Sequence, residues 1–376
     1  MRQARLKAPA DWGISHYHVV SRVVDRAFVL GPEEREQFIG FMRMYERLCG
    51  VQVLTYCILS NHFHLLIAVP RPPESPPTEQ DVLSIVRQAH GSKRADALAA
   101  ELHQVRAMAG DATARELLDR WTGRMWDISQ FMKTLKQRFT QWFNKRHKRK
   151  GTLWEERFRS SLVEGSGQAL HMVSAYIDLN PVRAGICDDP KDYRWSGYGE
   201  AVGGGKVAQA AFASLMRDGV ARPVGQVRQR ARNSKGDLDP APRLPLTTAG
   251  KEAVLAAYRA LLFGIGGEEG VREDGSPIRL GFDAERVRAE LVRGGRLGSA
   301  DFLRCRVRYF TDGAVLGSRR FVDGVFEALR DRFGEKRRDG ARRVRELGEV
   351  LYSLRALRLD PVSIPATPPA LPIPGG

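Results

Sequence analysis

The stretch Tyr56-Cys57-Ile58-Leu59-Ser60-Asn61-His62-Phe63-His64-Leu65-Leu66-Ile67-Ala68-Val69 decides the fold of this chain. Two apolar runs flank the polar break, and they predict a β-hairpin with strands over 51–59 and 62–69. Side chains alternate along a strand, so His62 and His64 share one face while Phe63 points to the other. Two imidazoles about 7 Å apart on one face can share a divalent cation. Taken alone, the pattern also fits a surface pair on an edge strand.

The sequence before the hairpin predicts a strand and then a helix. Residues 14–22 alternate as a strand does, and they carry a second pair, His16 and His18. Pro32 and three glutamates then open a helix, whose apolar stripe runs from Phe38 to Leu48. Strand, helix and hairpin in this order predict an α+β fold, with helices on one face of an antiparallel sheet.

The composition favours a polyanionic partner. The 376 residues include 60 Lys and Arg against 44 Asp and Glu, a net charge of +16, which points to nucleic acid. A generally basic proteome is the plainer explanation. Four scattered cysteines indicate neither a zinc knuckle nor a disulfide framework. No apolar run reaches the ~20 residues of a membrane span, and the amino terminus lacks a signal-peptide core, so we expect no membrane partner and a cytoplasmic, nucleoid-associated protein.

Two helical regions follow the hairpin. Residues 71–126 begin with prolines and continue as an Ala-rich helical insertion. A stronger helix is predicted over 128–147, with aromatic residues on one face and basic residues on the other. The basic residues there and just beyond are candidate DNA-phosphate contacts, although a solvated surface would look the same. They are Lys133, Lys136, Arg138, Lys145, Arg146, Lys148, Arg149 and Lys150.

The next segment alternates like a strand and then turns helical. Residues 152–164 have the strand pattern, and a helix is predicted over 168–179, ended by Asn180-Pro181 because a residue before proline disfavours the α conformation. Met172, Tyr176 and Asn180 fall on one helix face at spacings of four residues.

Together these motifs resemble the REP-associated tyrosine transposases, which belong to the single-tyrosine HUH endonucleases. The resemblance rests on Asn61-His62-Phe63-His64, on Gly151-Thr152-Leu153-Trp154, and on the block Tyr176-Ile177-Asp178-Leu179-Asn180-Pro181-Val182-Arg183-Ala184-Gly185. It covers about residues 10–200, with the insertion as a departure. It implies a ferredoxin-like HUH core that cuts and rejoins single-stranded DNA beside a hairpin, through a 5′-phosphotyrosine, in DNA transposition.

The resemblance also implies roles for particular residues. Tyr176 matches the nucleophile, His62 and His64 match the metal-binding pair, and Asn180 matches a third, polar ligand for Mg²⁺ or Mn²⁺. Such a metal would neutralise the charge of a phosphodiester, and a phenol is a leaving group that can be displaced again. Arg157 and Arg183 are further candidate phosphate contacts.

Plainer alternatives stay open for each of these residues. Tyr176 could be a core tyrosine, Asn180 could cap the helix, and His16 and His18 compete for the metal, with His18 on a strand near the site. For the whole chain, a non-catalytic regulator that binds DNA hairpins on the same fold is the main alternative. A replication initiator or relaxase is weaker, given the Asn-Pro-Val-Arg-Ala-Gly block.

The expected organisation is one catalytic domain and a carboxy-terminal region. Residues 1–205 form the HUH domain with its insertion at 71–126, and 206–246 form a basic linker. Residues 247–358 are mostly helical, with basic clusters such as a DNA-binding module carries, and 359–376 form a proline-rich, disordered tail. The sequence decides neither the DNA target nor whether the protein is a monomer or a homodimer.

Overall fold

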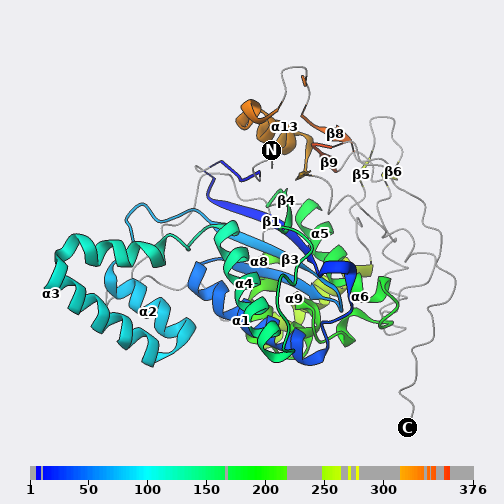
Figure 1. The fold of residues 1–376 in the computed structure, drawn as a ribbon. Coiled ribbons are helices and arrows are strands. Elements are labelled where there is room, and N and C mark those ends of the chain that lie inside the picture. Colours follow the sequence, from blue (N-terminus) through cyan, green and yellow to red (C-terminus); the bar gives the residue numbers. More distant parts are fainter. Residues whose placement is uncertain are drawn as a thin grey trace, which may run out of the picture.

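The computed structural model describes the sheet, its helices and parts of the carboxy-terminal half (Figure 1). The described residues are 6–9, 12–165, 168–217, 248–263, 270–271, 277–278, 314–333, 337–338, 340–343 and 351–355. Most of the expected basic linker, much of the region 247–358 that is expected to be mostly helical, and the proline-rich tail lie outside them. No helix among the described residues is long and apolar enough to cross a membrane.

The core is a four-stranded antiparallel sheet in the order β2-β3-β1-β4. Its elements follow one another as β1 (Ile14–Arg22), α1 (Pro32–Cys49), β2 (Gln52–Ile58), β3 (His62–Pro70), α4 (Ile128–Arg146) and β4 (Arg159–Val163), with the short 3₁₀ turn η1 (Val24–Arg26) after β1. This order of strands and helices is the ferredoxin-like arrangement. The predicted α+β class and the predicted hairpin are therefore confirmed.

Local chemistry explains where these elements begin and end. Pro32 occupies the first turn of α1, where no N–H is needed, and Gly50 ends the helix with a positive φ of 62°. In the hairpin, Leu59 N–H donates to the carbonyl of His62 and closes the turn at 2.9 Å. The turn fixes the register that places His62 at the start of β3.

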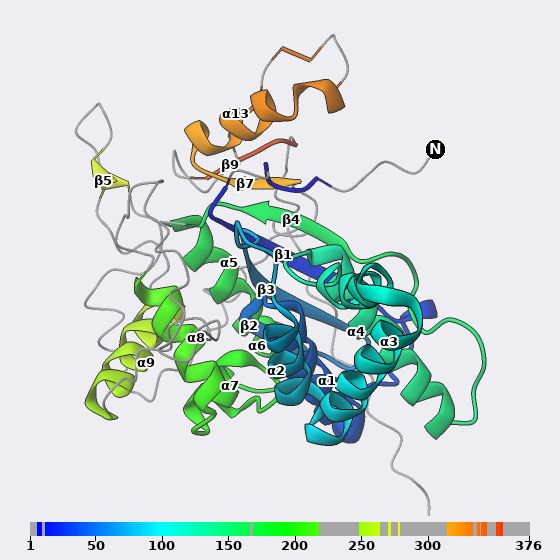
Figure 2. The same ribbon diagram turned by 90° about the vertical axis from the view of Figure 1, so that its left-hand side faces the viewer.

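The two faces of the sheet are covered by different helices (Figure 2). Phe63, Leu65 and Ile67 of β3 are fully buried against the layer that contains α1 and α4. Leu66 and Ala68 belong to the other cluster, which α5 (Gln168–Asp178) covers. The sequence predicted helices on one face of the sheet only. That prediction holds for α1 and α4, but α5 covers the opposite face. The even-numbered side chains of β3 need a second helical layer because they too are buried.

The second layer continues beyond α5. Its further members are α6 (Asn180–Arg183), the 3₁₀ turn η2 (Pro190–Asp192), α7 (Gly197–Val202), α8 (Lys206–Arg217) and α9 (Thr248–Phe263). α8 stands at the start of the expected basic linker, and α9 lies at the start of the region 247–358 that is expected to be mostly helical.

A buried carboxylate joins this layer. Asp178 accepts hydrogen bonds from the hydroxyl of Thr55 in β2 at 2.8 Å, from the hydroxyl of Tyr258 in α9 at 2.5 Å and from the backbone N–H of Tyr198 at 3.1 Å. Burial raises the pKa of the Asp178 carboxyl to about 7. The group ties α5 to β2, α7 and α9, so the helix that carries Tyr176 is held from three sides.

The helical insertion projects from the body (Figure 1). It consists of α2 (Glu79–His90) and α3 (Ser92–Thr122), and Gly110 interrupts α3 with φ 82°. Thr78 and Asp81 form a reciprocal capping box at the start of α2. α2 also packs on α1, which anchors the arm on the α1–α4 side.

The carboxy-terminal half adds strands as well as helices. β7 (Val315–Gly317) runs parallel to β4 and is followed across the sheet by β9 (Tyr352–Ser353) and β8 (Arg342–Arg343). The region also contains the helix α13 (Arg319–Ala328) and the 3₁₀ turn η3 (Arg330–Arg332), and β5 (Gly270–Val271) pairs with β6 (Pro277–Ile278). Part of the region expected to be mostly helical is therefore joined to the core sheet through β7, which the sequence pattern did not predict.

The strand expected over 152–164 is shorter than predicted. Only residues 159–163 join the sheet, and Trp154 forms a single bridge with Val23. The reason is the Trp154 ring, which packs among Phe38, Phe63 and Phe139 on the α1–α4 side. Burying the indole there draws the chain away from the sheet edge.

Candidate active site

His62 and His64 open β3 and point to the face that α5 covers. Their rings lie 5.1 Å apart, measured between centroids. His64 is 3% exposed, and His62 is partly exposed at the end of the strand. The pair therefore sits at the rim of a buried face, where a phosphate chain can approach from solvent.

Both imidazoles are held in the neutral form. Burial, with a contribution from the charge of Arg22, lowers the pKa of His62 to about 4. Burial also lowers the pKa of His64 well below its usual value, and His62, His18, Arg183 and Arg22 add to the effect. A neutral imidazole keeps a nitrogen lone pair, which a metal ligand requires.

The tautomer of His62 follows from its neighbour Asn61. The Asn61 amide nitrogen donates to the carbonyl of Arg26 at 3.1 Å, which turns its oxygen towards His62. His62 Nδ1 lies 2.6 Å from that oxygen and must be the donor. The lone pair of His62 is therefore on Nε2.

Tyr176 lies edge-on to two histidine rings. Its ring centroid is 5.6 Å from that of His64 and 5.9 Å from that of His18, both in T-shaped contact. The side chain is 8% exposed. The Arg183 guanidinium lies 4.5 Å above the ring, and its Nε and Nη1 are buried without a hydrogen-bond partner among the described residues. Two such donors next to a phenol suit an anionic oxygen.

The helix end next to Tyr176 is shaped by Asn180 and Pro181. Pro181 has no N–H to donate to the carbonyl of Ile177, four residues earlier. The side-chain amide of Asn180 donates instead, to the carbonyl of Tyr176 at 2.9 Å and to that of Ile177 at 3.3 Å. α5 ends at Asp178, one residue before the predicted end, and after Leu179 the chain forms the one-turn α6, which begins at Asn180 with Pro181 in its first turn.

The same hydrogen bonds decide what Asn180 can offer. Its NH₂ faces two carbonyls, so its Oδ1 points elsewhere and keeps its lone pairs. The residue is buried, one helical turn beyond Tyr176. Asn180 thus caps the helix with its nitrogen while its oxygen stays free of those carbonyls.

The donor set fits a hard divalent cation in a catalytic setting. Two neutral imidazoles and one amide oxygen leave several coordination positions for water and phosphate oxygens. Among the described residues, no group of three or more His, Cys, Asp or Glu is arranged to hold a metal. A site made of two histidines and the amide oxygen of Asn180 contains only two residues of those types, so it would not form such a group.

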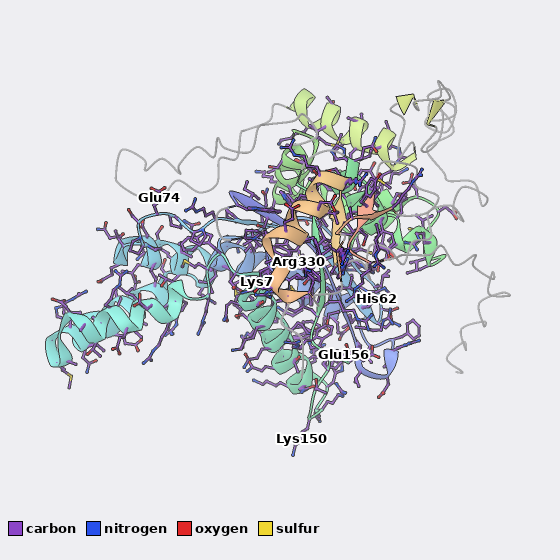
Figure 3. All side chains as sticks on the ribbon, turned by 90° about the horizontal axis from the view of Figure 1, so that it is seen from above. Lys7, His62, Glu74, Lys150, Glu156 and Arg330 are labelled. Atoms are coloured by element: carbon purple, nitrogen blue, oxygen red, sulfur yellow. The ribbon has the colours of Figure 1, made fainter. Side chains whose placement is uncertain are left out.

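The basic candidates fall into two groups. Lys133 and Arg138 are exposed on α4, which covers the face opposite Tyr176, and Arg138 lies over the ring of Phe41. The others follow at the end of α4 and in the loop after it. The last residues of this loop lie beside the site, because Glu155 N–H donates to the carbonyl of Arg22, the register partner of His62. This second group comprises Lys145, Arg146, Lys148, Arg149, Lys150 and Arg157. In Figure 3, Lys150 reaches farthest from the body on the side where His62 and Glu156 lie.

Lys136 does not belong to either group, contrary to the sequence prediction. It is buried, its ammonium donates to the carbonyl of Glu156 at 2.9 Å, and it lies over the Trp154 ring at 5.3 Å. Its charge is used to hold the loop against α4. A lysine in this position cannot contact a phosphate without breaking those interactions.

Sequence reasoning missed Arg22 and underrated His18. Arg22 is the register partner of His62 on β1, and its charge lowers the pKa of both site histidines. His18 lies against His64. The signal that could have found them is the alternation of β1, which places residues 18 and 22 on one face.

Comparison with known proteins gives a family match over part of the chain. The family model described as "Transposase IS200 like" matches residues 14–104 and 122–180. A solved structure described as "Structure of the REP associates tyrosine transposase bound to a REP hairpin" is 15% identical, with a TM-score of 0.35, over 61% of this chain and 96% of that chain. That likeness is too remote to say anything of the site. No curated protein matches the chain.

Proposed function

We propose that this protein is a metal-dependent endonuclease and strand transferase that acts on single-stranded DNA through Tyr176. The match of residues 14–104 and 122–180 to the IS200-like transposase family model supports this proposal. The observation that carries the proposal is the packing of the Tyr176 ring against the rings of His64 and His18. Tyr176 of α5 packs on a histidine of β3 that precedes it by more than a hundred residues, and Asn180 follows one helical turn later at the start of α6. A DNA-binding fold without chemistry requires no such set.

The reaction is a phosphoryl transfer to tyrosine. The phenolic oxygen of Tyr176 forms a bond to the phosphorus of a DNA phosphodiester, and the bond from phosphorus to the 3′-oxygen breaks. The phenolic proton leaves to solvent, and the departing 3′-oxygen takes up a proton from solvent. The products are a 5′-phosphotyrosine and a free 3′-hydroxyl. Attack by another 3′-hydroxyl reverses the step and joins a new strand without ATP.

His62, His64 and Asn180 would hold Mg²⁺ or Mn²⁺. The ion would supply Lewis-acid polarisation and neutralise charge on the phosphate oxygens. The protein's own side chains position the nucleophile and supply hydrogen-bond donors. Asp178 fixes α5 on the sheet, so Tyr176 is presented at a set distance from the histidines, and Arg183 places two unpaired donors above the phenol.

The DNA partner is proposed to be a single strand or a hairpin from a repetitive palindrome. The basic loop after α4 borders the end of the sheet at which His62 lies, which supports a path for a phosphate chain towards the site. The charge of +16 supports the same partner. The role of α13 and of the strands after β4 in DNA binding stays a prediction.

The test uses the full chain and a hairpin oligonucleotide with single-stranded flanks, labelled at either end. With Mg²⁺ or Mn²⁺ we expect a covalent adduct that survives denaturing electrophoresis and a released strand with a 3′-hydroxyl. Tyr176→Phe should bind the hairpin and form no adduct. The matched control is Tyr45→Phe, a buried tyrosine on the α1 side, which should still form it.

Two results would overturn the proposal. If Tyr176→Phe still formed the adduct, Tyr176 would not be the nucleophile. Tight hairpin binding that ignores EDTA, with no cleavage by the wild-type chain, would favour the non-catalytic regulator instead.

A further inference from the structure

His18 is buried at the centre of the site and has no role in the function proposed above. It lies on β1, where it is 1% exposed, and its ring stacks on that of His64 at a centroid distance of 5.3 Å with an interplanar angle of 14°. Its Nε2 is 3.0 Å from Nδ1 of His64. Two ring nitrogens at this distance share one proton in a hydrogen bond.

The direction of that hydrogen bond decides whether His64 can bind a metal. Its Nδ1 is engaged by His18, so Nε2 is the atom left for a metal. A histidine binds a metal as the neutral imidazole, which carries one proton on one of its two nitrogens. If His18 donated, the proton of His64 would sit on Nε2 and block ligation. If His64 donates, its Nε2 keeps the lone pair.

We propose that His18 is a positioning residue that accepts a hydrogen bond from Nδ1–H of His64 and so fixes Nε2 of His64 as the metal-binding atom. The inference rests on the proposed function, since it assigns His64 as a ligand. The neighbouring histidine supports it, because Nδ1 of His62 is held in the same way by the Asn61 oxygen. Each member of the His-Phe-His pair then has its Nδ1 tied to an acceptor in the protein and its Nε2 turned outward.

The choice of an imidazole as acceptor also suits the substrate. Metal-bound histidines most often donate to a carboxylate, a carbonyl or water. A carboxylate stacked on His64 would put a negative charge beside a phosphodiester, whereas a neutral imidazole adds none. His18 can also pack its ring edge against Tyr176, which an aliphatic acceptor such as Asn could do less well.

The experiment reads the tautomer directly in the metal-free protein. Full-length protein labelled with ¹⁵N-histidine is recorded by two-bond ¹H–¹⁵N correlation, and His64 is assigned among the eight histidines by the loss of its signals in His64→Gln. In the wild type we expect a protonated Nδ1 and an unprotonated Nε2. In His18→Leu we expect the proton to move to Nε2. His18→Gln supplies another acceptor and should restore the wild-type pattern, and His16→Gln on the same strand should leave it unchanged.

A second measurement links the tautomer to the metal. Calorimetric titration with Mn²⁺ alone should give His18→Leu an affinity about 10- to 100-fold below that of the wild type, and His18→Gln a value within a few-fold of it. Circular dichroism and thermal melting confirm that each variant is folded. The proposal is overturned if His64 of the wild type carries its proton on Nε2, or if His18→Leu changes neither the tautomer nor Mn²⁺ affinity. Neither the tautomer nor the Mn²⁺ affinity depends on DNA cleavage. If both measurements agree with the proposal but the wild type forms no adduct, the proposed function is refuted while the role of His18 stands.

Discussion

The two faces of the sheet use the same strand for different purposes. On the α1–α4 face, Phe63 and Leu65 meet Phe38, Phe139 and other apolar side chains in a dry core. On the α5 face, His62 and His64 meet Tyr176 and His18 instead of another apolar layer. Neighbouring residues of β3 therefore lie in different surroundings, one in the apolar core and the next in the candidate site.

The difference shows how a polar site can be kept in a buried place. The apolar face is held by non-directional packing, which tolerates small errors in position. The polar face depends on hydrogen bonds with fixed partners, such as those from Thr55 and Tyr258 to Asp178. We expect substitutions on the first face to lower stability and substitutions on the second to lower activity.

The largest expected effect is on the polar face. His64→Ala removes a ligand and leaves His18 without its partner, so adduct formation should fall by about 10³-fold or more, while hairpin binding persists. The rate is measured by gel under single turnover. His16→Ala, two residues before His18 on the same face of β1, is the control and should stay within a few-fold of the wild type. Equal losses in the two variants would contradict the division of roles.

The matching change on the apolar face is Phe63→Ala. This side chain is fully buried against Phe38 and Trp154, so its truncation should cost about 3–5 kcal/mol of unfolding free energy in urea. The control, Phe28→Ala, removes a ring that is 79% exposed and should change stability by at most about 0.5 kcal/mol. Under folding conditions Mn²⁺ affinity of Phe63→Ala should be unchanged. A loss of affinity with stability intact would show that the faces are not separate.

Part of the candidate site could be predicted from the sequence alone. The alternation in β3 and the spacing of four residues between Tyr176 and Asn180 could be read from the sequence because each is a local pattern. The contact of His18 with His64 depends on the register between β1 and β3, which is set by tertiary packing.

Other misses have equally physical causes. Burial of Lys136 follows from the loop that folds over Trp154, and a helical pattern does not reveal that cover. The strands after β4 are two or three residues long, too short for a two-residue period to show. The turn of α6 depends on the Asn180 amide replacing the N–H that Pro181 lacks.

A smaller effect is expected when a hydrogen bond to the buried carboxylate of Asp178 is removed. Tyr258→Phe deletes one hydroxyl donor to buried Asp178 and should cost about 1–3 kcal/mol of unfolding free energy. Because Thr55 donates to the same carboxylate, Thr55→Val and Tyr258→Phe should not be additive in a double-mutant cycle. Simple additivity in urea denaturation would argue that Asp178 does not join α9 to β2.

The smallest expected effect concerns the basic residues on the two sides. Lys148→Ala and Lys150→Ala should each weaken hairpin binding a few-fold and reduce the salt dependence of log Kd by about one. Lys133→Ala should do neither, because Lys133 lies roughly 20 Å back along α4 on the apolar side. Fluorescence anisotropy at several salt concentrations measures both. Equal slopes for all three variants would place the DNA along α4 rather than at the loop.

The central claim is that the polar face carries out phosphoryl transfer through one named tyrosine. The most direct measurement is tandem mass spectrometry of the wild-type protein after reaction with a hairpin oligonucleotide, nuclease trimming and trypsin. The account predicts a nucleotide remnant on Tyr176, in the peptide that ends at Arg183. A remnant on any of the other eight of the nine tyrosines, or no covalent species at all, would contradict it.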